Sequence, residues 1–170
     1  MIEGKEGATT GQEVRERLVG YIRENQSYFY RLAYQYVGDR DLAMDLVQDA
    51  VVKALQHWES LREPEAVRSW FYRILVRECL SFLRQDRRVI YLAEPPEQIQ
   101  SSQESGLEDR EVLRQAIDRL SPKLKTVVLL RFYEEMQLSE IAEITGTNLS
   151  TVKSRLYKGL KKLRESLQEG

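Results

Sequence analysis

The sequence predicts an all-α protein built from two small helical domains joined by a flexible acidic linker. Apolar residues recur at spacings of three and four on both sides of residues 89–106, which is the pattern of amphipathic helices. The segment 89–106 combines adjacent prolines with serines, glutamines and acids, a composition that cannot bury enough apolar surface to order itself. We therefore expect a disordered tail at 1–12, a first domain at 13–88, the linker at 89–106 and a second domain at 107–168.

The first domain is predicted to be a bundle of three to four helices, with three long helical patterns. Apolar residues from Leu18 to Tyr36 share one face of a helix that Gly38 closes. Asp39 is a good N-cap for the next helix, which runs to about Trp58. Pro64 suits the first turn of a third helix, because its fixed φ angle fits that position and its missing N–H would be unpaired there anyway.

The second domain is predicted to end in a helix-turn-helix. Ser121 and Pro122 supply an N-cap and a first-turn proline for one helix. The stretch 138–164 then predicts a short helix capped by Ser139, a turn at Gly146 and a long helix capped by Asn148. The expected core stripe of this last helix is Leu149, Val152, Leu156, Leu160, Leu163 and Leu167.

Charge is segregated along the chain although the formal net charge is only -1. Residues 148–164 carry six Lys or Arg and no acid, and residues 68–88 carry six Arg against two acids. Residues 94–111 carry six acids against one Arg. Two basic segments on either side of an acidic one favour nucleic-acid contacts at both.

The sequence does not favour an enzyme, a metalloprotein or a membrane protein. His57 is the only histidine and Cys79 the only cysteine, so neither a Cys/His metal set nor a serine–histidine site is expected. Asp45 and Asp49 share a helical face, but a solvated acidic face is commoner than a metal site. We expect no cofactor, no metal and no small-molecule substrate. The start of the chain lacks the pattern of a signal peptide, which predicts a cytoplasmic protein.

The most specific motifs are T-V-K-S-R-L at 151–156, GDRDLAMDLVQDAV at 38–51 and RSWFYRILVRECLSFLR at 68–84. Together they resemble the extracytoplasmic-function group of the bacterial sigma-70 family. The run T-V-K-S-R-L at 151–156 is typical of the group's fourth conserved region, and GDRDLAMDLVQDAV at 38–51 resembles its second region. RSWFYRILVRECLSFLR at 68–84 is similar to its helix that melts promoters and reads the minus-ten element. The resemblance implies an initiation factor that directs core RNA polymerase to promoters in a stress or cell-envelope response. It further implies an anti-sigma partner, which can be membrane-anchored, and a protein that joins the nucleoid when active.

The resemblance assigns roles to three groups of residues. The residues implied to contact core RNA polymerase, through its beta and beta-prime subunits, are Asp45, Leu46, Val47, Gln48, Asp49 and Val52. The residues implied to bind minus-ten DNA are His57, Trp58, Arg62, Arg68, Tyr72, Arg73, Arg77 and Arg84. The residues implied to bind minus-thirty-five DNA are Asn148, Ser150, Thr151, Lys153, Ser154, Arg155, Lys158, Lys161 and Lys162. The segment departs from the group at Met44, Arg77 and Ser81, so no minus-ten sequence is predicted.

Structural alternatives exist for several of these residues. Leu46 and Val47 suit the core of their helix, and Trp58, Trp70 and Phe71 could form a hydrophobic cluster rather than stack on bases. The linker could mimic a transcript or serve only as a tether. A stand-alone helix-turn-helix regulator, with a ligand-binding or dimerising N-terminal domain, is the alternative function, and an enzyme acting on nucleic acid is a third.

Overall fold

A computed structural model describes residues 11–89 and 105–169 of the 170-residue chain. Within these two stretches all regular elements are helical, which confirms the predicted all-α class. The predicted linker lies largely outside the described residues, between helices that end at Val89 and begin at Ser105. In chain order the elements are α1 (Gly11–Glu24), α2 (Gln26–Val37), α3 (Arg40–Gln56), the 3-10 turns η1 (Trp58–Ser60) and η2 (Pro64–Ala66), α4 (Val67–Val89), α5 (Ser105–Asp118), α6 (Pro122–Phe132), α7 (Leu138–Thr145) and α8 (Leu149–Gln168).

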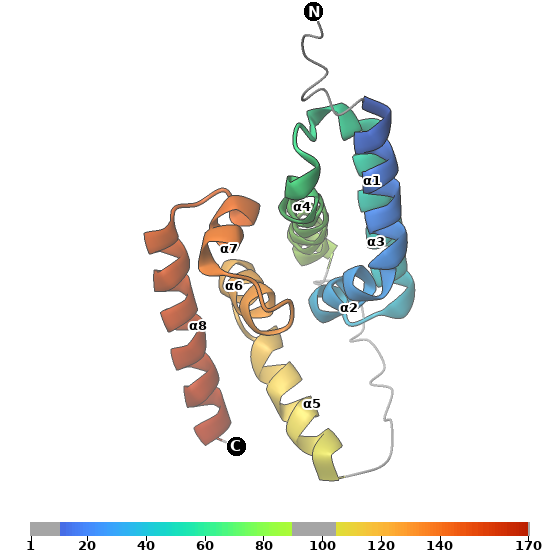
Figure 1. Ribbon diagram of the computed structural model, residues 1–170. Helices are drawn as coiled ribbons and strands as arrows, with labels where there is room; N and C mark the ends of the chain where they lie inside the picture. Colours follow the sequence, from blue (N-terminus) through green and yellow to red (C-terminus); the bar gives the residue numbers. More distant parts are fainter. Residues whose placement is uncertain (1–10, 90–104, 170) are drawn as a thin grey trace, which may run out of the picture.

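The predicted first helix is in fact two helices, α1 and α2, which meet at an angle (Figure 1). The break is at Asn25, whose side-chain amide donates to the carbonyl oxygen of Tyr21 at 2.8 Å. Asparagine competes with helical hydrogen bonds in this way, and the Asn25 backbone leaves helical geometry at φ -116° and ψ 14°. The predicted tail was also too long, because Gly11 and Gln12 already belong to α1.

The signals around α3 act as the sequence predicts. Gly38 adopts the left-handed conformation at φ 65°, which glycine reaches without steric cost. Asp39 then caps α3 by accepting a hydrogen bond from the backbone N–H of Leu42 at 3.0 Å. Pro64 opens the short turn η2, and α4 follows directly at Val67. The third helix therefore starts one 3-10 turn later than expected.

An aromatic cluster forms the centre of the first half. The rings of Phe29 and Phe71 lie 4.3 Å apart and both side chains are fully buried. Tyr21 and Tyr72 pack around them in tilted and edge-on contacts. Such pairs contribute about 0.5–1.5 kcal/mol beyond their area burial. This cluster joins α1, α2 and α4 into one unit and so fixes the position of α4.

The second half is organised around α6, of which residues 124–130 are all buried. α8 packs against α6 and α7. Asn148 caps α8 by accepting from the N–H of Thr151 at 2.8 Å, and Gly146 adopts φ 66° in the preceding turn. The expected cap at Ser139 is wrong, because α7 begins at Leu138 and its N-cap is Gln137.

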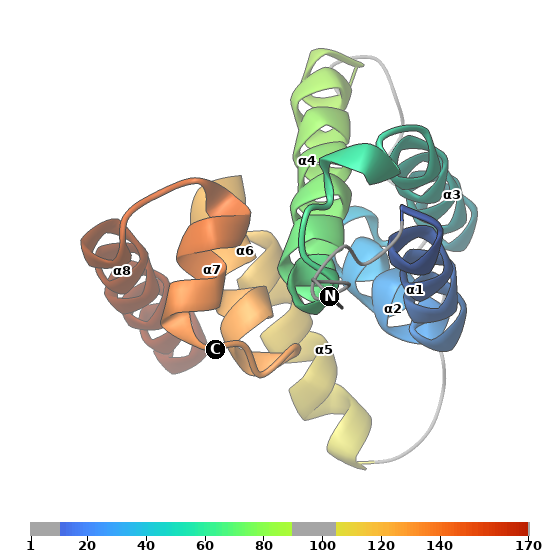
Figure 2. The same cartoon turned by 45° about the horizontal axis from the view of Figure 1, so that its top comes forward.

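The two halves are in contact, and α4 lies between the α1–α3 group and the α5–α8 group (Figure 2). α7 packs against α4, with smaller contacts between α4 and α6 and between α2 and α5. Buried apolar side chains therefore continue from one half into the other. Among the described residues, no helix has the length and apolar character that a membrane span requires.

Candidate nucleic-acid interface

A groove of about 780 Å³ runs between the end of α3, η1 and the length of α4. Its lining consists of Lys53, His57, Ser60, Trp70, Arg73, Ile74, Arg77, Glu78, Ser81 and Arg84. The α4 members recur every three or four residues, with Arg73–Ile74 and Arg77–Glu78 as adjacent pairs, so they project from one face of the helix. That spacing is visible in the sequence, which left Trp70 between base stacking and core packing, and it could have identified Ser81 in advance.

The groove combines positive charge with one large aromatic ring. Four of its side chains are Lys or Arg, and Glu78 is its one acid. Lys53 and Glu78 form an ion pair that joins α3 to α4. The indole Nε1–H of Trp70 donates to the hydroxyl oxygen of Ser60 at 3.2 Å, which holds the ring at the mouth between η1 and α4. Cations that follow a backbone and a ring that accepts a base are the two parts of a single-strand binding surface.

α8 presents a second cationic surface of a different shape. Its buried side chains are Val152 and Leu163, with Gly159 against α6. Leu149 and Leu167 are 43% and 45% exposed, so the predicted apolar stripe is shorter at both ends. Ser150, Lys153, Ser154, Lys158, Lys161 and Lys162 are exposed, whereas Thr151 and Arg155 are half-buried. This convex helix with short polar residues first and cations later suits a duplex groove.

The predicted docking residues on α3 fall into two classes. Asp45, Gln48, Asp49 and Val52 are exposed. Leu46 and Val47 are 6% and 8% exposed, so their side chains pack inside the bundle as the core alternative predicts, and their contact with a partner stays a prediction. The exposed acids lie beside Met44 and Val52, two apolar side chains that are about half exposed. An acidic face with apolar neighbours is a credible protein-binding surface.

Two sequence comparisons identify the family. Residues 21–89 match sigma-70 region 2 and residues 110–163 match sigma-70 region 4. The RNA polymerase sigma factor SigV of Bacillus subtilis is 43% identical over 157 residues, which cover 92% of this chain and 94% of that protein. The chain belongs to the sigma-70 family. The similarity to its extracytoplasmic-function group, inferred from three motifs, is thereby confirmed, and the stand-alone regulator is disfavoured.

Other relatives of this sigma factor agree. The RNA polymerase sigma-E factor of Streptomyces coelicolor is 32% identical, and the match covers 86% of this chain and 84% of that protein. Two solved structures share the fold. The sigma factor RpoE of Bartonella quintana, in complex with the anti-sigma factor NepR, has a TM-score of 0.69 at 23% identity and covers 88% of this chain and 95% of its own. CnrH in complex with the cytosolic domain of CnrY has a TM-score of 0.71 at 16% identity, and the match covers 94% of this chain and 95% of the CnrH chain.

The groove of this sigma factor lies within region 2 but does not include all the residues expected to bind minus-ten DNA. His57, Arg73, Arg77 and Arg84 line it. Arg62 is exposed on the loop before Pro64, outside the lining. Trp58 is half-buried against the start of α1, where a Cβ on Gly11 would come within 3.0 Å of its ring, so it is mainly a packing residue.

Tyr72 is the clearest departure from the predicted set. Its side chain is 3% exposed, and its hydroxyl donates to the Glu134 carboxylate of region 4 at 2.6 Å. Burial and the hydrogen bond to Glu134 both raise the pKa of Tyr72 above its ordinary value. Arg68 is likewise engaged, since its guanidinium donates to the carbonyl oxygen of Glu134 at 2.9 Å. Tyr72 therefore cannot stack on a base in this conformation, because region 4 covers it.

The described part of the sigma factor holds no cluster of three His, Cys, Asp or Glu side chains that could bind a metal ion. Cys79 is fully buried, and burial raises the pKa of its thiol to about 12. A thiol with that pKa carries almost no thiolate at neutral pH and is therefore a poor nucleophile. The family to which the chain belongs consists of non-enzymatic transcription initiation factors.

Proposed function

We propose that this sigma factor divides promoter recognition between two surfaces. The region 2 groove takes unpaired bases and phosphates of the nontemplate strand at the minus-ten element. The exposed face of α8 reads the minus-thirty-five duplex. The observation that carries the proposal is the contrast between a concave cationic groove that contains Trp70 and a convex cationic helix. Splayed bases require a concave surface with a ring to stack on, whereas the major groove of a duplex admits a helix.

The exposed side of α3 is proposed to dock on core RNA polymerase. Asp45, Gln48 and Asp49 are exposed within about one turn of the helix, with Val52 a further turn along. These acids complement a basic partner, and the half-exposed Met44 and Val52 supply apolar area beside them. The groove opens on α4 and η1 and uses only Lys53 and His57 from the end of α3, so DNA and polymerase can be bound at the same time.

Regulation by an anti-sigma factor is proposed as well. One fold neighbour is a sigma factor solved in complex with an anti-sigma factor, and another, CnrH, was solved in complex with the cytosolic domain of CnrY. A partner with a cytosolic domain fits the expectation of a cytoplasmic sigma factor that is held at the membrane until a stress or envelope signal releases it. Association with the nucleoid would then follow release.

Reconstituted transcription tests the proposal. Purified core polymerase with this chain should initiate from a subset of a promoter library, whereas core polymerase alone should not. Asp49→Lys should abolish polymerase binding by placing a cation against a basic partner, and Glu24→Lys, an equal charge change on an exposed residue of α1, should not. Failure of the wild-type chain to initiate anywhere in the library would overturn the proposal.

A further inference from the structure

The aromatic ring of the groove is joined to the turn η1 through one hydroxyl group. The indole Nε1–H of Trp70 donates to the hydroxyl oxygen of Ser60 at 3.2 Å. The same hydroxyl donates to the backbone carbonyl oxygen of His57, the C-cap of α3, at 2.8 Å. A serine hydroxyl can donate one hydrogen bond and accept others, so both contacts are made together. Ser60 therefore links the orientation of the Trp70 ring to the end of α3.

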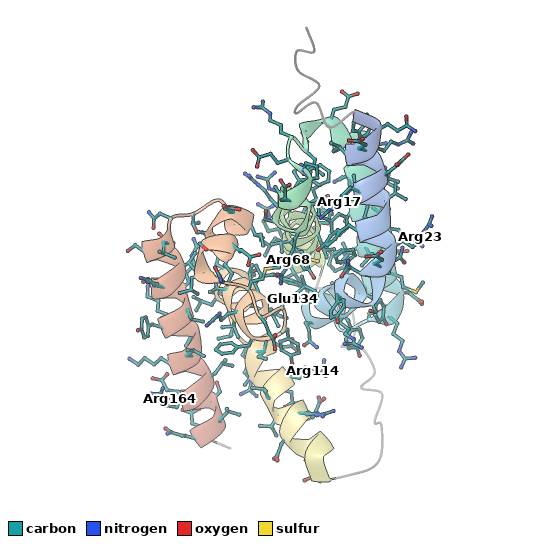
Figure 3. The ribbon with its side chains drawn as sticks, in the orientation of Figure 1. Arg17, Arg23, Arg68, Arg114, Glu134 and Arg164 are labelled. Carbon is teal, nitrogen blue, oxygen red and sulfur yellow. The ribbon has the colours of Figure 1, made fainter. Side chains whose placement is uncertain are left out.

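The other side of η1 lies against α1. The ring of Trp58, the first residue of η1, is next to Gly11, the first residue of α1. A Cβ on Gly11 would lie 3.0 Å from Cη2 and 3.3 Å from Cζ3 of that ring. α1 also contacts η2 and α4, and side chains fill the space between α1 and the start of α4 (Figure 3). Because Gly11 has no side chain, η1 can pack directly on α1.

Packing alone fixes only part of the Trp70 side chain. The residue is half-buried, because it packs against the apolar core and also lines the groove. A ring that is immobile before binding loses no rotamer freedom when a base stacks on it. Without Ser60, the indole N–H would have to find water or another acceptor, and the ring could adopt other orientations. The hydrogen bond to Ser60 therefore determines how the ring faces the strand.

We propose that Ser60 is a positioning residue for base stacking. Its hydroxyl holds the Trp70 ring in the orientation that accepts an unpaired base, and the packing of Trp58 on Gly11 holds η1, and with it Ser60, in place. The proposal rests on the function proposed above for the region 2 groove and deepens it. Gly11 lies before the segment 21–89 that matches region 2. The start of α1 therefore contributes to strand binding from outside the matched segment.

Substitutions at Ser60 in the full chain test the positioning role. Ser60→Ala removes the hydroxyl, whereas Ser60→Thr keeps it and is the matched control on an exposed side chain. Each variant is titrated with two labelled single strands of equal length, one of mixed sequence and one made of abasic nucleotides. Ser60→Ala should bind the mixed-sequence strand about threefold or more weakly than the wild type, because one stacked base contributes about fivefold or more in affinity. All three proteins should bind the abasic strand equally, because it offers phosphates but no base.

The fluorescence of Trp70 reports the ring directly. The sequence has two tryptophans, so Trp58→Phe leaves Trp70 as the one indole and keeps an aromatic ring at position 58. In this background, adding Ser60→Ala should lower the fluorescence anisotropy of Trp70 in the unbound protein, and adding Ser60→Thr should not. A serine that only contacted the strand itself would leave this anisotropy unchanged, as would a Trp70 ring held by packing alone.

A second pair of variants tests the part played by α1. Gly11→Val pushes on the Trp58 ring and should weaken binding of the mixed-sequence strand while binding of the abasic strand is unchanged. Gly20→Val makes the same substitution on α1 where a Cβ has no neighbour within 4 Å, and it should bind both strands as the wild type does. Combining Gly11→Val with Trp58→Phe should restore binding, because phenylalanine lacks the Cη2 and Cζ3 atoms that the new side chain meets.

Three results would overturn the positioning role. Ser60→Ala could bind the mixed-sequence strand as tightly as the wild type, lose affinity for both strands by the same factor, or leave the anisotropy of Trp70 unchanged. A failure of the proposed function is distinguishable from these, because it appears in the wild type before any variant is compared. The wild-type chain would then bind the mixed-sequence and abasic strands with equal affinity.

Discussion

The groove of region 2 and the exposed face of α8 carry similar charge but differ in shape. The groove has four cations, one acid and Trp70 in a hollow of about 780 Å³. Residues 148–164 have six cations and no acid on or beside a single convex helix. Charge alone would assign both to nucleic acid without saying which kind. The proposed function follows this difference in shape, with single strands in the hollow and duplex on the helix.

The two surfaces also differ in the contacts that fix them to the rest of the protein. Three elements build the groove, and the Lys53–Glu78 and Trp70–Ser60 contacts tie them together. α8 is held in place by its buried residues Val152, Gly159 and Leu163, of which Gly159 allows the helix to approach α6 closely. A Cβ on Gly159 would lie 2.8 Å from Val128 Cγ2. Disruption of that strip should therefore affect one surface and spare the other.

The largest expected effect comes from Gly159→Leu. Overpacking against Val128 should cost about 1–3 kcal/mol or more, which exceeds the gain in helix propensity of about 1 kcal/mol over glycine. We expect loss of minus-thirty-five duplex binding and a lower midpoint for the unfolding of region 4, measured by calorimetry, with single-strand binding retained. Gly20→Ala in α1 is the control, because nothing lies within 4 Å of its Cβ and it should be neutral or stabilising. Equal loss of both kinds of binding would contradict the separation of the surfaces.

Replacing the aromatic residue of each surface should give unequal effects. Trp70→Ala should weaken single-strand binding by about 1–3 kcal/mol, the usual contribution of one stacked base. Tyr157 is 75% exposed on α8, and no stacking partner exists on an intact duplex, so Tyr157→Ala should change duplex binding far less. Fluorescence anisotropy with labelled oligonucleotides measures both. A larger effect at Tyr157 than at Trp70 would mean that the two surfaces have been assigned the wrong way round.

Salt dependence should distinguish the cations of the two surfaces. Lys161→Ala should lower the slope of log K against log salt for duplex by about 0.9, whereas Arg77→Ala should lower the slope for single strands by about 0.7. Each variant should leave the slope for the other ligand unchanged, because the two side chains lie on separate helices. Slopes that change together would show that both nucleic acids share one surface.

Local signals in the sequence were sufficient for most of the fold. Gly38, Asp39 and Asn148 act as predicted because the left-handed turn and the cap hydrogen bonds involve residues within four positions. The break at Asn25 was missed because the apolar spacing continues across it, so periodicity alone cannot distinguish one helix from two.

The candidate site was less predictable where contacts join distant parts of the chain. Arg77 and Arg84 could be assigned from charge and spacing. Lys53 could not, since its place in the groove depends on how α3 packs against α4. Tyr72 was expected to be available for DNA, yet it is covered by Glu134, a residue 62 positions away. Helical periodicity carries no information about which half of the protein will cover a given face.

The smallest expected effect is a pH dependence of the contact between the two halves. Burial raises the pKa of Glu134 above its ordinary value, while the Tyr72 hydroxyl and the guanidinium groups of Arg68 and Arg31 oppose the rise. Tyr21 on α1 also faces this group, but with a pKa of about 12 it stays neutral. The closed form therefore binds a proton at Glu134 more readily than the open form does.

Closure should then be most stable below the ordinary glutamate pKa and should weaken as pH rises through the higher value of the closed form. Energy transfer between fluorophores attached at Asp41→Cys and Glu165→Cys, which are exposed and lie one on each half, should fall as the pH is raised through the pKa of Glu134 in the closed form. Glu134→Gln keeps an acceptor for Tyr72 but cannot titrate, so its transfer should be less dependent on pH, whereas Glu135→Gln should behave as the wild type. If Glu134→Gln keeps the full pH dependence, some other group controls closure, and the polar contact at Glu134 serves only to align the two regions.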